Sequence, residues 1–524
     1  MTETRSEVDD ASTAKAPGRF IRRIEAISRA IPDPVIIFIF LLGAALLLTA
    51  LIGGHSFESL GRDGGVVQYT IADMTSSDNI RWLFDNAILA NWLGYGNGVL
   101  GVILVVMLGV GIAEHSGLLT AVIKALGARL SEKMMAPAVI FIGIMSSLAT
   151  DAGYLVLIPL AGLLYAGLGK NPLIGMAAAF AGVSAGFSAN LLPATPVDVI
   201  IGVNAQAFAE AQGVPFESGS GAPLTPATMH YFFILASTLM LVVVGGWVTR
   251  RFVQPRLERM PFELPEEIDL SDFRLSDNER RGLRAAGLGL LAALAVVLAL
   301  GLGPLAPYEN EAGRTVVPYL DNVILLIALV FAMVGIAFGY RTGRFTAMAD
   351  VVQAMVKQMN SLGYIMVLTF FCYNFLALLK YSELGTYITY LGATLLANLG
   401  LESFPIGLIL GFVVVTALIN LFVGGLVSKW MLLGPIFIPM LYQVNPQMTP
   451  DMVAAAYRVA DSSTNIITPM MGYAGVILAF MRKYQPKLTI GEMMLMMLPY
   501  SLAFLLAWSA LLIFFFSFGI PLGF

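Results

Sequence analysis

A run of polar and ionisable residues interrupts a hydrophobic segment near the C-terminal end of the chain. The run extends from Tyr457 to Pro469 and holds an Arg, an Asp, an Asn and several hydroxyl residues. Arg458, Asp461 and Asn465 stand at i, i+3 and i+7, so in a helix they share one face. Ionisable groups at membrane depth cost roughly 2.5–3.5 kcal/mol each and are usually functional. The pattern indicates a ligand site or, as the structural alternative, a buried ion pair between Arg458 and Asp461.

One chemistry that these residues offer is cation binding. A carboxylate and amide carbonyl oxygens are the ligands that a hard cation such as Na⁺ prefers. Asp461 supplies the charge, and Asn420 and Asn465 supply neutral oxygens. We therefore expect these residues to bind a cation, and we include Asn190, which occupies the corresponding place in the first half of the chain.

The second chemistry is anion binding. An Arg guanidinium holds a carboxylate through two hydrogen bonds, and a Lys ammonium holds it as a point charge. Arg458 and Lys429 are the candidates, and Trp430 could stack on an aromatic ring of the same substrate. The alternatives are that Lys429 extends its ammonium to the membrane surface and that Trp430 is an interfacial anchor.

The polar run has a counterpart in the first half of the chain. Ser188-Ala189-Asn190-Leu191-Leu192 resembles Ser463-Thr464-Asn465-Ile466-Ile467, and Pro193 and Pro196 follow the first copy as Pro469 follows the second. Collinear matches continue upstream, where Ser116 and Thr120 correspond to Ser382 and Thr386. Paired interrupted segments in corresponding halves point to the binding site of a secondary transporter. Ser188 and Ser463 are therefore added to the substrate-binding candidates.

The composition indicates a polytopic membrane protein. Of 524 residues, 58% are hydrophobic and 12% charged, and the mean hydropathy is +0.81, which excludes an ordinary soluble domain. A net charge of −4 without a basic face argues against nucleic acid as a partner. Cys372 is the only cysteine, and three widely separated histidines give no metal-binding spacing.

Clusters of basic residues predict the orientation. Arginines precede the first apolar run and crowd the segment 250–284, so the N terminus and this linker are expected in the cytoplasm. The stretch 204–228 has no Lys or Arg and is expected outside. An odd number of spans then places the C terminus in the periplasm, with the bacterial inner membrane as the location.

We predict an all-α polytopic membrane protein with nine transmembrane helices, two re-entrant hairpins and inverted-topology repeats. From the N terminus, the chain is expected to have a cytoplasmic tail 1–33, a first transmembrane half 34–249 with a hairpin 136–168, and the linker 250–284. A second transmembrane half 285–516 with a hairpin 404–442 and an external tail 517–524 follow. Asp151, near the tip of the first hairpin, would bind an ion or cap a half-helix. The spans near 34–52, 231–248, 287–302 and 322–338 lack polar breaks and are expected to form a static dimer frame.

The second half, with Asn420, Ser428-Lys429-Trp430, Pro450 and the stretch from Ala456 to Pro469, resembles the AbgT family. The Ser188–Pro196 break followed by Asp198 is similar to that family's first-half motif. The resemblance implies a dimeric inner-membrane transporter, driven by an ion gradient, for p-aminobenzoyl-glutamate uptake or sulfonamide antimetabolite export. It also implies Na⁺ at Asn420 and Asp461, and a substrate path lined by Asp198, Trp430, Pro450, Arg458 and Asp461.

The sequence also allows three alternatives, which are a different transported substrate, an ion channel and an intramembrane enzyme. The substrate could be another organic anion, such as a dicarboxylate. An ion channel would show a continuous ring of polar residues, and broken helices in inverted repeats argue against it. An intramembrane enzyme would need a nucleophile beside a base, and no such pairing is evident. We therefore expect a transporter rather than an enzyme, with membrane lipid and a second copy of the chain as its other partners.

Overall fold

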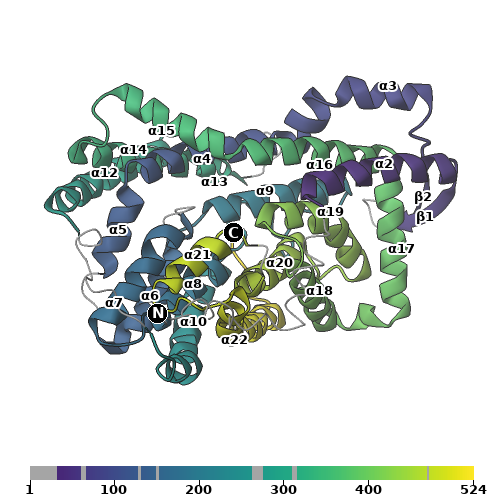
Figure 1. Ribbon diagram of the computed structural model, residues 1–524. Helices are drawn as coiled ribbons and strands as arrows, with labels where there is room; N and C mark the ends of the chain where they lie inside the picture. The colour runs from purple at the N-terminus through teal and green to yellow at the C-terminus, as the bar shows by residue number, and fades with distance from the viewer. Residues whose placement is uncertain are drawn as a thin grey trace, which may run out of the picture.

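The computed structural model of the chain describes residues 32–60, 66–127, 132–148, 153–262, 275–309, 315–468 and 471–524. Helices form most of this structure and lie in two layers (Figure 1). The predicted helical class is therefore confirmed, with one correction. Two short antiparallel strand pairs occur, β1 (Ser56–Leu60) with β2 (Val66–Thr70) and β3 (Tyr308–Glu309) with β4 (Thr315–Val316), so the chain is not purely α-helical.

Long apolar helices make up the first layer, along the upper side of Figure 1. In it α12 (Asp277–Leu302) packs on α14 (Val323–Thr342), α14 packs on α4 (Val99–His115), and α2 (Pro34–Ile52) packs on α16 (Gly363–Tyr381). Few side chains of α2, α12 and α14 are buried. The side chains of α2, those of α12 from Ala285 onward and those of α14 as far as Gly339 are almost all apolar, a composition suited to crossing a membrane.

The second layer holds the interrupted helices together with α10 (Tyr231–Val248) and α22 (Ile490–Ser517). The first interrupted pair is α6 (Glu132–Met145) with α7 (Ile158–Gly167), and the second is α18 (Pro405–Asn420) with α19 (Leu426–Val444). The predicted grouping of 231–248 with the frame is wrong, because α10 packs against α6 and α22 instead.

Two further helices are interrupted in this layer. The first consists of α8 (Pro172–Phe180), continued by η5 (Ala181–Ala185), and then α9 (Pro196–Ala211) after a non-helical segment. The second consists of α20 (Pro450–Thr464), continued by η9 (Asn465–Ile467), and then α21 (Ala474–Arg482). Both predicted breaks are therefore present.

The remaining elements connect and cover the two layers. They are α3 (Ser77–Asn86), η1 (Leu89–Leu93), η2 (Tyr95–Asn97), α5 (Leu118–Gly127), η3 (Ser146–Leu148), η4 (Gly153–Leu157), η6 (Thr249–Val253), α11 (Gln254–Leu257), α13 (Pro318–Asp321), α15 (Met348–Ser361), α17 (Leu384–Asn398) and η8 (Leu401–Ser403). Helical structure thus enters the predicted linker 250–284 from both sides, because α10 continues through η6 and α11, and α12 begins at Asp277. The middle of that linker, the tail 1–31 and Asp151 lie outside the described residues.

Six helices in the described part of the chain are long and apolar enough to cross a membrane: Pro34–Ile52, Tyr231–Leu257, Asp277–Leu302, Val323–Thr342, Gly363–Tyr381 and Ile490–Ser517. All six coincide with predicted spans. Other apolar helices of the described residues are shorter, among them α4, the hairpin arms and the broken helices. The hairpin arms and the broken helices end at the polar runs that predicted their interruption, whereas α4 has no polar run and was expected to be a plain span.

The internal repeat is visible in matching hydrogen bonds. The Ser116 hydroxyl donates to the Ala113 carbonyl oxygen and accepts from the backbone N–H of Leu118, the first residue of α5. The Ser382 hydroxyl likewise donates to the Leu379 carbonyl oxygen and accepts from the backbone N–H of Leu384, the first residue of α17. The same pair of bonds at corresponding serines supports the sequence correspondence.

Candidate functional site

The first break positions Asp198 at the start of a helix. The chain between η5 and α9 is non-helical, and Ala194 within it has a positive φ of 52°, which is uncommon for a residue with a side chain. Thr195 then caps α9: its hydroxyl accepts from the Asp198 backbone N–H, and the Asp198 carboxylate accepts from the Thr195 backbone N–H at 2.9 Å. This capping box fixes one carboxylate oxygen and leaves the other facing the second half.

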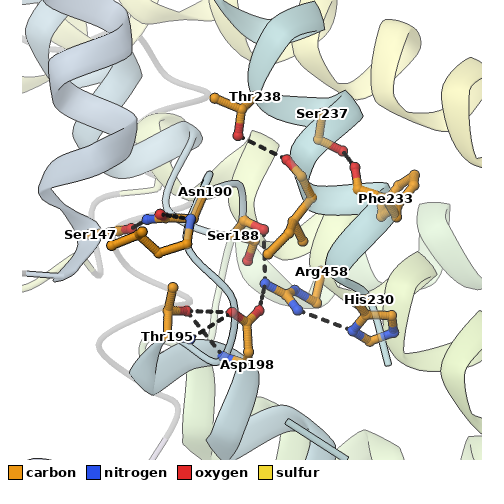
Figure 2. Close-up of polar contacts among 12 residues, drawn as sticks. Ser147, Ser188, Asn190, Thr195, Asp198, His230, Phe233, Ser237, Thr238 and Arg458 are labelled. Atoms are coloured by element: carbon orange, nitrogen blue, oxygen red, sulfur yellow. Dashed lines mark hydrogen bonds and ion pairs between the residues drawn. The ribbon is translucent and has the colours of Figure 1, made fainter. Parts of the chain in front are cut away.

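That free oxygen meets Arg458 of α20 (Figure 2). The Asp198 Oδ1 atom lies 2.6 Å from Arg458 Nη2, which also donates to the Ser188 carbonyl oxygen at 2.8 Å. Arg458 Nη1 donates to His230 Nδ1 at 3.1 Å. Because an arginine can only donate, the His230 proton must be on Nε2, which donates to the Asp451 carbonyl oxygen at 2.8 Å. One guanidinium thus joins the first break, α10 and α20.

Two polar atoms at this junction keep unused hydrogen-bonding capacity. Arg458 Nε and Ser188 Oγ are buried, and neither has a hydrogen-bond partner among the described residues. An unsatisfied buried donor costs about 1–3 kcal/mol, more when it is charged. Free donors beside a break in two helices are the features expected of a site for a polar, anionic ligand.

A second cluster lies between α18, α19 and α20. The Lys429 ammonium bonds both the Asp461 carboxylate and the Asn420 side-chain oxygen. Asn420 Nδ2 donates to the Asp461 backbone oxygen and to Thr464 Oγ1, each at 2.7 Å. Lys429 and Asp461 are each only 1% exposed, so the pair is fully enclosed by protein.

These contacts overturn three structural alternatives. The predicted ion pair between Arg458 and Asp461 is wrong, because Arg458 pairs with Asp198 and Asp461 pairs with Lys429. Lys429 does not extend to the membrane surface, because its ammonium is buried in the Asp461 pair. Trp430 is not an interfacial anchor, because it is 0% exposed.

Trp430 fastens the start of α19 to the first half of the chain. Its indole N–H donates to the Ile201 carbonyl oxygen of α9 at 3.2 Å. Its ring lies 4.8 Å from the Tyr457 ring and 6.0 Å from the Phe208 ring, measured between centroids. The Tyr457 hydroxyl in turn donates to the Leu426 carbonyl oxygen at 2.6 Å. Stacking of Trp430 on a substrate would therefore require this packing to open.

The breaks and interrupted helices meet one another. Asn190 in the first break donates to Ser147 Oγ beside the interruption of the first pair at 3.1 Å (Figure 2). Asn465 at the second break donates to Ser184 Oγ in η5 at 2.9 Å. The Tyr154 ring after the first interruption stacks on Tyr473 at a centroid distance of 4.4 Å. The structure thus brings together the segments that the internal repeat singled out, although Pro469 lies outside the described residues.

The other predicted residues are near the site without touching its charges. The Ser463 hydroxyl donates to the Val459 carbonyl oxygen of its own helix at 2.5 Å. Pro450 is buried at the first turn of α20, about 12 Å along the helix from Arg458 at 1.5 Å per residue. Asn190 and Asn465 use their amides in the contacts just described, and in the described part of the chain neither is hydrogen-bonded to Asp461.

Two residues of the site were not predicted from the sequence. His230 looked like an isolated histidine, yet it orients Arg458 across two helices. Thr464 is one of several hydroxyl residues in the polar run, and its hydroxyl accepts a hydrogen bond from the Asn420 amide. Both act through contacts between distant parts of the chain. A search for polar residues at the ends of neighbouring apolar segments could have found His230, which directly precedes α10.

A sodium ion fits the second cluster better than a transition metal does. In the described part of the chain no group of three His, Cys, Asp or Glu side chains is placed to hold a metal ion. The side-chain oxygens of Asn420 and Asp461 nevertheless converge on one positively charged group, the Lys429 ammonium. One carboxylate with neutral oxygens suits a monovalent hard cation.

Comparison with known proteins gives one consistent result. A model of the AbgT putative transporter family matches residues 19–524. The chain is 26% identical over 508 residues to the p-aminobenzoyl-glutamate transport protein of Escherichia coli (strain K12), covering 97% of this chain and 96% of that protein.

Two solved structures resemble the whole fold. The YdaH transporter of Alcanivorax borkumensis superposes with a TM-score of 0.83 at 37% identity, covering 94% of this chain and 100% of that one. MtrF of Neisseria gonorrhoeae, described with a class of antimetabolite efflux pumps, has a TM-score of 0.82 at 34% identity, with 94% and 97% covered. The chain therefore belongs to the AbgT family of membrane transporters.

Proposed function

We propose that this chain is an ion-gradient-driven secondary transporter for p-aminobenzoyl-glutamate-like folate catabolites or for sulfonamide antimetabolites. The observation that carries the proposal is the pair of unused donors, Arg458 Nε and Ser188 Oγ, buried where two broken helices meet. The named activities of the relatives, p-aminobenzoyl-glutamate transport and antimetabolite efflux, supply the substrate class.

Arg458 would recognise the anionic part of the substrate. Its guanidinium pairs with the Asp198 carboxylate through Nη2 and keeps Nε available. A substrate carboxylate or an ionised sulfonamide can therefore bind beside Asp198 or displace it. Ser188 Oγ lies on the residue whose carbonyl oxygen accepts from Arg458, so it can add a second hydrogen bond. Trp430 and Tyr457 would offer aromatic surface to a benzoyl ring once the packing between their buried rings opens.

The coupling cation would bind at the second cluster. Asn420 and Asp461 would hold Na⁺, and the Asp461 carboxylate would balance its positive charge. The two clusters lie on one helix, α20, with Arg458 and Asp461 one turn apart. A movement of α20 that alters one cluster must therefore alter the other, which is the physical requirement for coupling.

The proposed membrane arrangement has nine transmembrane helices and two re-entrant hairpins in inverted repeats. The N terminus and the linker around 250–284 would be cytoplasmic, and 204–228 and the C terminus periplasmic, in the bacterial inner membrane. The exposed apolar helices α2, α12 and α14 would contact lipid and a second copy of the chain in a homodimer.

Two experiments test this proposal. Purified protein in liposomes should accumulate labelled p-aminobenzoyl-glutamate or a sulfonamide when a Na⁺ or pH gradient is imposed, and should not do so without one. Uptake that ignores every gradient would indicate a channel. Single cysteines at 210–225 and at 276–284, in a Cys372→Ser background, should react with an impermeant reagent from opposite sides. Labelling of both from the same side would contradict the inverted repeats.

A further inference from the structure

The Lys429 ammonium occupies the position between the two oxygens that a coupling cation would need. It bonds the side-chain oxygen of Asn420 and the carboxylate of Asp461, and both partners are buried with it. We propose that Lys429 is a tethered internal cation that competes with Na⁺ for this site, so that Na⁺ binds only when the ammonium leaves. The inference rests on the proposed cation-coupled transport and adds a residue to it.

The orientation of Asn420 supports the competition. Its Nδ2 faces two groups, the Asp461 backbone oxygen, which can only accept, and Thr464 Oγ1, which itself donates to the Ala460 carbonyl oxygen. The amide NH₂ is therefore committed to α20, and the amide oxygen must face the ammonium. The same orientation presents that oxygen to any cation that replaces Lys429.

Charge balance makes the replacement an exchange rather than an addition. Asp461 contributes one negative charge, and among the described residues Lys429 is the cationic side chain that forms an ion pair with it. Two cations beside one enclosed carboxylate would repel each other strongly, because little water screens them. Exchange of one unit positive charge for another leaves the cluster neutral throughout.

The chain around Lys429 allows the ammonium to move. Lys429 lies in the first turn of α19, and this helix begins directly after a non-helical stretch that ends at Gly425. Gly425 has φ +82°, a conformation that other residues rarely adopt, and because glycine has few steric limits we assign it as the hinge of the proposed movement. The Lys429 contacts join α19 to α18 and α20, and their loss would free the start of α19, which also carries Trp430. Cation entry would thereby release the interruption between α18 and α19.

Two measurements on the purified full-length protein test this inference. Lys429→Gln removes the competing charge, so its Kd for ²²Na⁺ should be at least tenfold lower than that of the parent. Lys429→Arg keeps a cation and should bind Na⁺ no more tightly than the parent. Lys124→Gln, which removes a lysine paired with Glu279 at 3.0 Å outside this site, is the matched control and should leave the Kd unchanged.

The second measurement needs no variant. Reductive methylation of lysines with formaldehyde, quantified by mass spectrometry, should modify Lys429 several-fold faster in NaCl than in choline chloride, with Lys124 unaffected. A parent that binds Na⁺, with an unchanged Kd in Lys429→Gln and Na⁺-independent methylation, overturns the competition and leaves cation coupling in place. Absence of Na⁺ binding in both parent and variant overturns the inference together with the proposed coupling ion.

Discussion

The two buried ion pairs of the site are held in different ways. Asp198 of the first pair is fixed by the capping box of α9, and Arg458 is fixed by His230 and the Ser188 carbonyl oxygen. Lys429 of the second pair lies four residues after Gly425, a glycine with positive φ at the interruption between α18 and α19, and its ammonium bonds two side chains, Asn420 and Asp461. We call the Asp198–Arg458 pair braced, because other hydrogen bonds fix both of its side chains where the two halves meet. The Lys429–Asp461 pair lies beside the proposed hinge at Gly425.

This difference suggests a division of labour. A braced guanidinium with one free N–H is organised in advance to recognise an anion, and little needs to move when the ligand binds. A lysine near a hinge can exchange with an external cation and thereby change the position of the helix that carries it. We therefore assign substrate recognition to Arg458 and Asp198, and coupling to Lys429 and Asp461.

The largest effect is expected when the braced pair loses one partner. Arg458→Ala leaves the Asp198 carboxylate buried and unpaired, which should cost about 3–5 kcal/mol in the free energy of unfolding. The double variant Arg458→Gln with Asp198→Asn should recover most of the thermal stability in detergent but not substrate binding. A well-folded double variant that binds p-aminobenzoyl-glutamate as the parent does would remove Arg458 from the recognition site.

A smaller loss of stability is expected at the hinge. Asp461→Asn leaves the Lys429 ammonium without its carboxylate, but Asn420 still accepts from it and the hinge lets it move, so the cost should be about 1–3 kcal/mol. Affinity for Na⁺ should fall about tenfold for each 1.4 kcal/mol of binding free energy lost. Thermal unfolding and ²²Na⁺ binding measure both quantities. A stability loss as large as that of Arg458→Ala would show that both pairs are braced.

The smallest loss of stability is expected when the capping box that fixes Asp198 is removed. Thr195→Ala removes the hydroxyl that caps α9 and should cost about 1 kcal/mol. Thr489→Ala is a matched control, because Thr489 and Glu492 form the same capping box in α22. Both variants should lose similar stability, but only Thr195→Ala should weaken substrate binding, since Thr195 also holds Asp198. Equal transport kinetics in the two variants would contradict a role for this cap in recognition.

The sequence predicted the broken helices, because polar residues and prolines in apolar segments leave few other structures at membrane depth. It also proposed Arg458, Asp461, Asn420 and Trp430 as candidates through residue chemistry and family resemblance. It did not predict the pairing of these charges. Helical spacing offered a pair between Arg458 and Asp461 as a structural alternative, whereas the actual partners, Asp198 and Lys429, come from distant segments and depend on how the halves pack.

The most direct test of the division of labour compares two kinds of flux in liposomes. Exchange of labelled for unlabelled substrate needs recognition but no gradient, whereas net accumulation needs coupling as well. The double variant Lys429→Gln with Asp461→Asn should retain exchange and lose gradient-driven accumulation, and Arg458→Gln with Asp198→Asn should lose both. Accumulation by the first variant, or exchange by the second, would contradict the assignment of coupling and recognition to the two ion pairs.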